Sequence, residues 1–296
     1  MGIGSKKIAI CVDSSAGFDA KKYNDVFIVP LLINENIDGR SFSYKDGVDI
    51  TCDEVSKKLL DGSTIKTSSS IPGDIISLFD KLSSQYDEIM CFTAPRSISG
   101  TYNSWAIALS ANQYKNVHLF EQTMVCAPLE WTIVDLIKAR SAGILTVEFV
   151  NNYLKKTYGK KQIDILVPDL KYLVRGGRIS KFSGNMVSIF QLQVTVTLTD
   201  TELKKFGVDG SVKRAIKRVA IDCFSELKKR GKVKRIAIFT NSVCDPKYDY
   251  KKFRDLVMQE LKTYIGGGIV IEEHKLPPFI IAHVGPNYVG LAMEVV

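Results

Sequence analysis

The sequence predicts an α/β protein of two domains, residues 1–160 and 161–296, and three observations support this. With 296 residues, the chain is long enough for two domains that each bury a core. Its 45% hydrophobic and 24% charged residues are typical of a compact globular protein. In the first half, short apolar runs alternate with segments of helical spacing, as in βαβ units. Such units build a doubly wound, mainly parallel sheet.

In the N-terminal domain, short aliphatic runs with polar breaks predict strands, and apolar residues at helical spacing predict helices. The predicted strands are Lys7–Val12, Val26–Ile33, Glu88–Thr93 and Asn116–Phe120. The predicted helices are Thr51–Leu60, Gly73–Leu82, Thr101–Asn112, Pro128–Ser141 and Thr146–Tyr158.

The C-terminal domain is also predicted to be α/β, with a mixed sheet. It follows the pair Lys160–Lys161 and includes a glycine-rich turn at Arg175–Arg178. Its predicted strands are Ile163–Val167, Leu192–Leu198, Arg235–Thr240, Ile269–His274 and Val289–Val295. Its predicted helices are Ser211–Lys229 and Lys247–Tyr264.

Composition limits the function classes. The net charge of +8 comes mostly from lysine pairs on amphipathic helices, the pattern of solvated faces, and no nucleic-acid recognition motif accompanies it. We therefore expect no nucleic-acid partner, and a DNA-binding regulator remains an alternative that rests on charge alone. We find no long apolar run or signal-peptide core. The six cysteines form no CxxC pair, so we expect a reducing, cytoplasmic location.

Familiar catalytic motifs are absent. The sequence contains no GxxxxGK[ST], GxSxG or HExxH pattern, so nucleotide hydrolysis and zinc chemistry lack support. Only three histidines occur, and neither His118 nor His274 has a cysteine or histidine partner at metal-ligand spacing. We expect no metal, no cofactor and no catalytic residue.

Two hydroxyl-rich segments each precede a predicted helix: Thr67–Ser70 lies before Pro72, and Ser97–Thr101 follows the strand that ends at Thr93. In a doubly wound sheet, ligands bind beyond the carboxyl ends of the strands, where we expect both segments to lie. Hydroxyls beside a helix N-terminus, with a glycine that lets backbone approach, suit a carboxylate or phosphate. The alternative is that they are ordinary helix caps.

Four motifs and the opening Val12-Asp13-Ser14-Ser15 resemble signatures of the DegV family of bacterial fatty-acid-binding proteins. They follow the family's order over nearly the whole chain. The motifs are Thr67-Ser68-Ser69-Ser70-Ile71-Pro72-Gly73, Ser99-Gly100-Thr101-Tyr102-Asn103-Ser104, Leu173-Val174-Arg175-Gly176-Gly177-Arg178-Ile179 and His283-Val284-Gly285-Pro286.

The resemblance implies a two-domain fold with an acyl chain buried in a tunnel and its carboxylate held by hydroxyls. Matched by motif, Thr67 and Ser99 hold the carboxylate. The other lipid-binding positions are Ser68, Gly100 and Thr101, and the expected network around the head group and a partner contains Asp13, Ser14, Arg178 and His283. For Arg178 and His283, a surface turn and a structural histidine are the alternatives.

The resemblance also implies the partners. The ligand is expected to be a long-chain fatty acid such as palmitate, stearate or oleate, drawn from the membrane by transient surface contact. A separate fatty acid kinase is expected to convert the bound acid to acyl phosphate. The alternative is a stand-alone phosphotransferase or hydrolase that acts on an anionic substrate at the same loops, with His283 as acid or base.

The sequence departs from the family pattern in three places. Ser70 stands where proline is usual and Ile71 where serine is usual, which affects the loop that follows Thr67. Arg96 stands among positions that usually carry small hydroxyl residues, and it either adds a cation near the carboxylate or faces solvent. The stretch Leu192–Thr197 lacks a common Lys-Pro pair, which weakens the expectation of an ordinary kinase partner.

Overall fold

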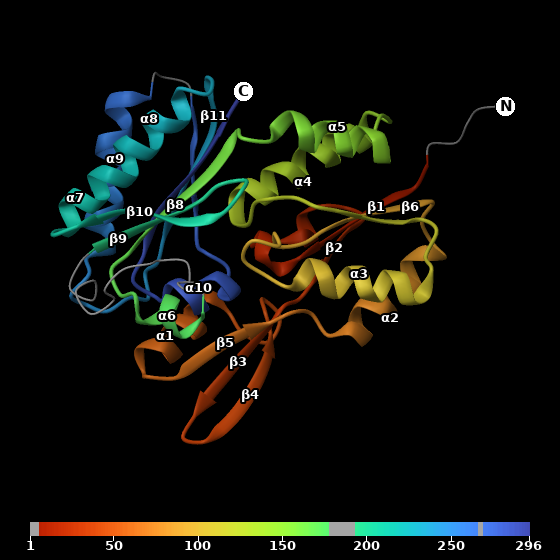
Figure 1. Ribbon diagram of the computed structural model, residues 1–296, viewed down its shortest axis with the longest axis horizontal. Helices are drawn as coiled ribbons and strands as arrows, with labels where there is room; N and C mark the ends of the chain where they lie inside the picture. The colour runs from red at the N-terminus through yellow and green to blue at the C-terminus, as the bar shows by residue number, and fades with distance from the viewer. Residues whose placement is uncertain (1–5, 178–192, 266–268) are drawn as a thin grey trace.

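A computed structural model describes residues 6–177, 193–265 and 269–296. The strands in these ranges form three sheets, and helices cover or separate them (Figure 1). The predicted α/β fold, with one parallel and one mixed sheet, is confirmed.

The first sheet is parallel and has the strand order β2-β1-β6-β7. Its strands are β1 (Ile8–Asp13), β2 (Val26–Val29), β6 (Glu88–Phe92) and β7 (Val117–Phe120). One face packs against α2 (Pro72–Ser83) and α3 (Thr101–Asn112). The other packs against α4 (Cys126–Ser141) and α5 (Val147–Thr157) (Figure 1). These elements match the predicted alternation of strands and helices in βαβ units.

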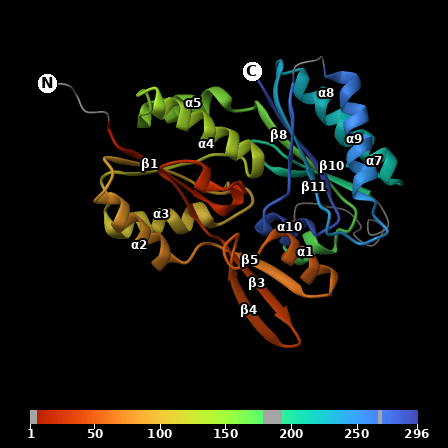
Figure 2. The same cartoon turned by 180° about the vertical axis from the view of Figure 1, so that it is seen from behind.

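The second sheet is mixed, with the order β10-β9-β8-β13-β11-β12, and β11 and β12 are its parallel pair. Its strands are β8 (Lys161–Val167), β9 (Gln193–Leu198), β10 (Leu203–Asp209), β11 (Val233–Thr240), β12 (Ile271–His274) and β13 (Val289–Val295). Its outer face packs against α7 (Val212–Lys217), α8 (Cys223–Lys228) and α9 (Tyr250–Tyr264) (Figure 2). A π-helical turn, Arg218–Asp222, joins α7 to α8. The division into two domains at residue 161, where β8 begins, stays a prediction.

A third, antiparallel sheet was not predicted. It has the order β4-β3-β5 and consists of β3 (Leu32–Ile37), β4 (Arg40–Lys45) and β5 (Thr64–Ser68). The predicted single strand Val26–Ile33 is therefore wrong, because β2 ends at Val29 and β3 belongs to a different sheet. Pro30 stands at the break, and it has no N–H group with which to continue a ladder.

The inner face of the mixed sheet meets α1 (Cys52–Leu60), α6 (Lys171–Arg175) and α10 (Pro278–Val284) (Figure 1). Helix α4 lies between the two large sheets. Its residues Leu129 and Ile133 join the core of the parallel sheet, whereas Trp131 joins the core beneath the mixed sheet. This double contact explains why α4 is apolar around most of its circumference.

Candidate lipid pocket and head-group site

A narrow apolar pocket lies between the inner face of the mixed sheet and α10. Ile163 and Ile165 of β8, Val196 and Leu198 of β9, and Phe279 of α10 line it. Its cavity volume is about 60 Å³, room for only a few water-sized groups. A long acyl chain therefore enters only if the lining side chains move apart.

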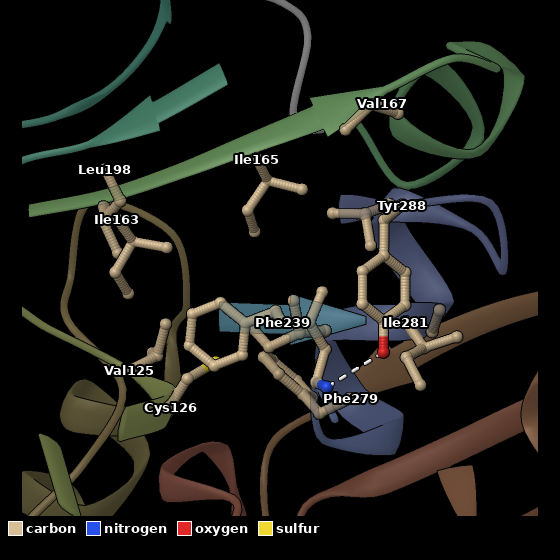
Figure 3. Packing of buried hydrophobic residues seen from close by; sticks show 14 of the residues in the cluster. Val125, Cys126, Ile163, Ile165, Val167, Leu198, Phe239, Phe279, Ile281 and Tyr288 are labelled. Carbon is tan, nitrogen blue, oxygen red and sulfur yellow. Dashed lines mark hydrogen bonds between the residues drawn. The ribbon is translucent and has the colours of Figure 1, made fainter. Parts of the chain in front are cut away.

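Strand alternation produces the apolar wall. Ile163 is paired with Leu198, and Ile165 with Val196, so successive inward residues of the two strands lie side by side. Figure 3 shows Ile163 and Ile165 extending from β8 towards Phe279. Tyr288 stands beside this core, where its hydroxyl oxygen accepts a hydrogen bond from the backbone N–H of Leu276 at 3.0 Å (Figure 3).

His283 gives the pocket a polar end. It lines the cavity, is 6% exposed, and lies with its Nε2 atom 2.8 Å from Thr67 Oγ1. The ring of Phe279, one helical turn earlier in α10, packs edge-on against the imidazole. Thr67 and His283 are 216 positions apart in sequence, and the fold brings them into hydrogen-bond contact. Their predicted place at the head group of a bound acid stays a prediction.

Gly176 ends α6 and Gly285 ends α10, and the lack of a side chain at each lets the two helices pack closely. A Cβ atom on Gly176 would lie 2.3 Å from His283 Nδ1, and one on Gly285 would lie 2.2 Å from the ring of Tyr172. Gly285 also has a φ of +82°, which a residue with a side chain rarely adopts. Arg178, the predicted charged residue of the glycine-rich turn, lies outside the described residues.

The Ser99 segment reaches the same pocket. Ile98 lines the cavity, and the next residue, Ser99, accepts a hydrogen bond from the Thr101 backbone N–H at 3.2 Å. The hydroxyls of Ser99 and Thr101 are 2.8 Å apart, and Gly100 is the N-cap of α3. Ser99 and the N-terminus of α3 thus follow directly on a residue that lines the apolar cavity, and a helix N-terminus suits an anion.

The family model described as an uncharacterised protein of the DegV family matches residues 7–295. The chain belongs to the DegV family. A DegV domain-containing protein of Mycoplasmopsis pulmonis is 31% identical over 218 residues, 72% of each chain. Another from Mycoplasma genitalium is 25% identical and covers 95% of this chain and 97% of its own length.

Solved structures of two DegV proteins and of a further fatty-acid-binding protein have the same fold. A fatty-acid-binding DegV protein from Thermus thermophilus has a TM-score of 0.81 at 20% identity, covering 98% of this chain and 100% of its own. One from Streptococcus agalactiae has a TM-score of 0.82 at 20% identity, covering 98% and 99%. A stearic acid-binding protein from Eubacterium ventriosum has a TM-score of 0.79 at 23% identity, covering 97% and 98%.

In this DegV chain, Asp13 and Ser14 hold the framework of the site through hydrogen bonds to other protein groups. Asp13 Oδ2 accepts the Ala94 backbone N–H at 2.7 Å and so fixes the start of the loop that leads to Ser99. Ser14 accepts the Leu31 N–H at 3.0 Å and donates to Asp46 Oδ2 at 2.7 Å. Their predicted direct role at the head group stays a prediction.

Asp46 is a buried carboxyl that the sequence analysis missed. It is 1% exposed, and burial raises its pKa to about 7. Hydrogen bonds from the Ser14 hydroxyl and the Phe279 backbone N–H lower this pKa, whereas the nearby Asp13 charge raises it further. Burial likewise raises the pKa of Asp13 to about 6, against hydrogen bonds from Ser15 and Ala94. An isolated Asp in a polar stretch gives no sequence signal for such burial.

The side chains of Ser68, a predicted lipid-binding position, and Arg96, for which two alternatives were open, each have partners within the protein. Ser68 follows Thr67 in β5, so its side chain points to the opposite face, where it accepts a hydrogen bond from Asn34 at 3.0 Å. Thr67 also lies within the antiparallel sheet, so the expectation that both hydroxyl segments follow strands of the parallel sheet is wrong for this one. Arg96 is half-exposed, stacks on Tyr102 and lies 3.5 Å from Glu121.

The sequence analysis did not name Cys126 as a site residue, and it did not predict the burial of Ser70. Cys126 lines the pocket at the start of α4 and has a φ of +54°, which is uncommon for a residue with a side chain. Ser70 is 2% exposed, and its hydroxyl has no hydrogen-bond partner within the described part of the chain. Neither feature is visible from residue type alone.

Within the described ranges, no helix is both long and apolar enough to cross a membrane. Those ranges likewise contain no cluster of three or more histidine, cysteine, aspartate or glutamate side chains placed to hold a metal ion.

Proposed function

We propose that this chain binds one long-chain fatty acid in the pocket, with its carboxylate at the end marked by Thr67, His283 and Ser99, and presents it to a fatty acid kinase. One observation carries the proposal: an apolar cavity ends at a buried histidine that contacts a threonine hydroxyl. The structural neighbours described as fatty-acid-binding proteins support the same ligand class.

Burial of the acyl chain supplies the affinity. Sixteen carbons gain roughly 0.8 kcal/mol per methylene, or about 12 kcal/mol before the costs of association and ordering. Part of this is spent in opening the narrow cavity, because the lining side chains must leave their present contacts. The net affinity still suits a carrier that holds its ligand firmly.

The head-group end needs only to satisfy the carboxylate. Thr67, Ser99 and Thr101 offer hydroxyl donors, and the N-terminus of α3 offers backbone N–H groups and a partial positive charge. These neutral donors leave a carboxylate oxygen able to attack a phosphoryl group. In the proposed reaction, that oxygen attacks the γ-phosphorus of ATP held by the kinase, which gives acyl phosphate and ADP.

This chain's own part in the reaction is positioning. The sequence has no nucleotide-binding motif, which favours a separate kinase over a stand-alone phosphotransferase. Arg178 and the basic surface are proposed to contact the kinase and the membrane, respectively, during transfer and loading.

The binding proposal is tested with delipidated protein and hexadecanoate, measured by titration calorimetry. Thr67→Val combined with Ser99→Ala should weaken binding about tenfold or more, because two hydrogen bonds to a charged group are lost. Ser68→Ala is the matched control, since this neighbouring hydroxyl faces Asn34, and it should leave the affinity unchanged. A wild type that binds no fatty acid, and yields none on solvent extraction, would refute the proposal.

The transfer proposal is tested separately, with a purified fatty acid kinase and ATP. ADP should form only when the kinase, the loaded chain and ATP are all present. ADP formation by the loaded chain without the kinase would instead favour the stand-alone phosphotransferase.

A further inference from the structure

A second, more polar cavity lies next to the lipid pocket. Its volume is about 510 Å³, and its walls include Met124, Thr132 of α4, Lys161 of β8 and Asp200. Lys155 of α5 stands at its exposed rim. None of the residues assigned to fatty-acid binding lines this cavity.

The two cavities lie end to end along the same strands. Ile165, Ile163 and Lys161 alternate along one face of β8, and the first two line the lipid pocket while the third lines the second cavity. Likewise, Leu198 closes the lipid pocket on β9, and Asp200 lies just beyond it. The distal end of the pocket, away from His283, therefore points to Lys161.

The distance suits a long-chain acid. From Ile165, which lines the lipid pocket, to Lys161, which lines the second cavity, β8 advances four residues, or about 13 Å. An extended chain of about sixteen carbons is longer than this, because its zigzag of roughly 1.5 Å bonds advances a little over 1 Å per carbon. Met124, an unbranched side chain that adapts readily to new neighbours, lines the second cavity, and the next residue, Val125, lines the lipid pocket.

Lys161 is an unusual residue for the end of an apolar channel. Its side chain is 4% exposed, and its Nζ donates to Thr132 Oγ1 at 2.5 Å. The Glu294 carboxylate is 3.8 Å away, beyond hydrogen-bond distance, so the three N–H donors have one short bond among the described residues. Burial lowers the pKa of Lys161 to about 8, so the ammonium form still prevails at neutral pH.

We propose that the second cavity binds the distal end of a long-chain acid that carries a hydroxyl group at its ω carbon, with Lys161 donating to that hydroxyl. The inference rests on the proposed fatty-acid site and names its substrate class. Two cations, Lys155 and Lys161, and two carboxylates, Glu121 and Asp200, line the cavity. A neutral hydroxyl can donate and accept among these groups, whereas a second carboxylate would meet both acidic side chains.

The test compares hexadecanoate with 16-hydroxyhexadecanoate by titration calorimetry of the delipidated full chain. The wild type should bind the two acids with affinities within about threefold of each other. If the hydroxyl instead met an apolar dead end, its unpaired burial would weaken binding by tenfold or more. That result, with hexadecanoate bound normally, would overturn this inference and leave the proposed function intact. Failure of both acids to bind would refute the proposed function itself.

Lys161→Met provides the residue-level test. The variant should lower the affinity for 16-hydroxyhexadecanoate about tenfold, because a hydrogen bond to a charged donor is lost. Its affinity for hexadecanoate should change less than threefold. Glu294 remains near two cations, since Lys234 Nζ and Arg235 Nε are each 3.4 Å away. Lys156→Met is the matched control and should change neither affinity, because this exposed neighbour of Lys155 on α5 does not line the cavity. Equal weakening of both acids by Lys161→Met would contradict the assignment.

If the Lys161 variant fails to fold, a measurement on the wild type alone still tests the proposal. Moving the hydroxyl from carbon 16 to carbon 10 places it against the apolar rows of Ile163 and Ile165. The 10-hydroxy acid should therefore bind at least tenfold more weakly than the 16-hydroxy acid. Equal binding of the two positional isomers would overturn the proposal.

Discussion

The two faces of the mixed sheet contrast in how they are filled. On the outer face, Leu166 and its neighbours pack against α7, α8 and α9 in an apolar core. On the inner face, Ile165, the adjacent residue of the same strand, borders a cavity that ends in His283. Polar groups stand at both ends of the inner wall, with Thr67 and His283 at one end and Lys161 at the other.

This contrast separates stability from binding. A fully packed face gains the most from dispersion and burial, but it leaves no room for a ligand. A binding face must give up some packing and must keep buried polar groups satisfied by one another until a ligand arrives. Strand alternation lets one sheet do both, because neighbouring residues of a strand serve opposite faces.

The largest expected effect tests the outer face. Leu261 of α9 is fully buried in the outer core, so Leu261→Ala should lower the free energy of unfolding by about 2–5 kcal/mol. The affinity of the folded protein for hexadecanoate should not change. Urea unfolding and titration calorimetry measure the two quantities.

The inner-face counterpart is Ile165→Ala. Because Ile165 already borders a cavity, the free energy of unfolding should fall by only about 2 kcal/mol, the lower end of the range expected for Leu261→Ala. The affinity for hexadecanoate should fall several-fold. If Leu261→Ala weakened hexadecanoate binding as much as Ile165→Ala does, the inference that the outer face supplies stability and the inner face supplies binding would be wrong.

The next effect concerns the buried carboxyls beneath the site. Burial raises the pKa of Asp46 from its ordinary value of 3.8 to about 7, so between these values the folded protein holds a proton that the unfolded chain has released. Raising the pH from about 4 to 7 therefore destabilises the folded state. Asp46→Asn should remove this contribution and gain stability relative to the wild type, by roughly 2–4 kcal/mol across the window.

Thermal unfolding at several pH values between 4 and 8 measures this difference. Asp38→Asn, in the exposed turn between β3 and β4, is the control and should follow the wild type at every pH. Asp13 keeps its own raised pKa in the variant, so a weaker slope should remain. Parallel curves for Asp46→Asn and the wild type would show that Asp46 does not titrate in this range.

The elements that were predicted well are those whose pattern is local. The strands and helices of the parallel sheet follow directly from apolar runs and helical spacing. The third sheet was missed because a single apolar run, Val26–Ile33, feeds two sheets, and its break is marked only by Pro30. Helix α10 was missed because all seven of its residues are buried, so it has no polar face and no helical period.

The residues of the candidate site also differ in how far the sequence alone could predict them. Motif similarity, which carries information that spacing lacks, singled out Thr67, Ser99 and His283, and their contact with a ligand stays a prediction. That the Ser68 side chain faces Asn34, away from Thr67, does not follow from residue type, because the faces of two neighbouring hydroxyls are known only once the strand is known. In the sequence, Lys161 is only half of the lysine pair that precedes a predicted strand, and only the structure shows that its side chain is buried.

The smallest expected effect tests how precisely His283 is placed. Gly176→Ala adds a Cβ atom that would lie 2.3 Å from His283 Nδ1, so the imidazole or the turn must shift by several tenths of an ångström. The 2.8 Å contact between His283 and Thr67 should lengthen, and hexadecanoate should bind several-fold to tenfold more weakly. Gly210→Ala is the matched control, because a Cβ atom there meets nothing within 4 Å. Unchanged affinity in Gly176→Ala, with Gly210→Ala also unchanged, would mean that the pocket tolerates a displaced histidine. The head group would then depend mainly on Thr67 and Ser99, and the polar end of the inner face would be less rigid than its buried contacts imply.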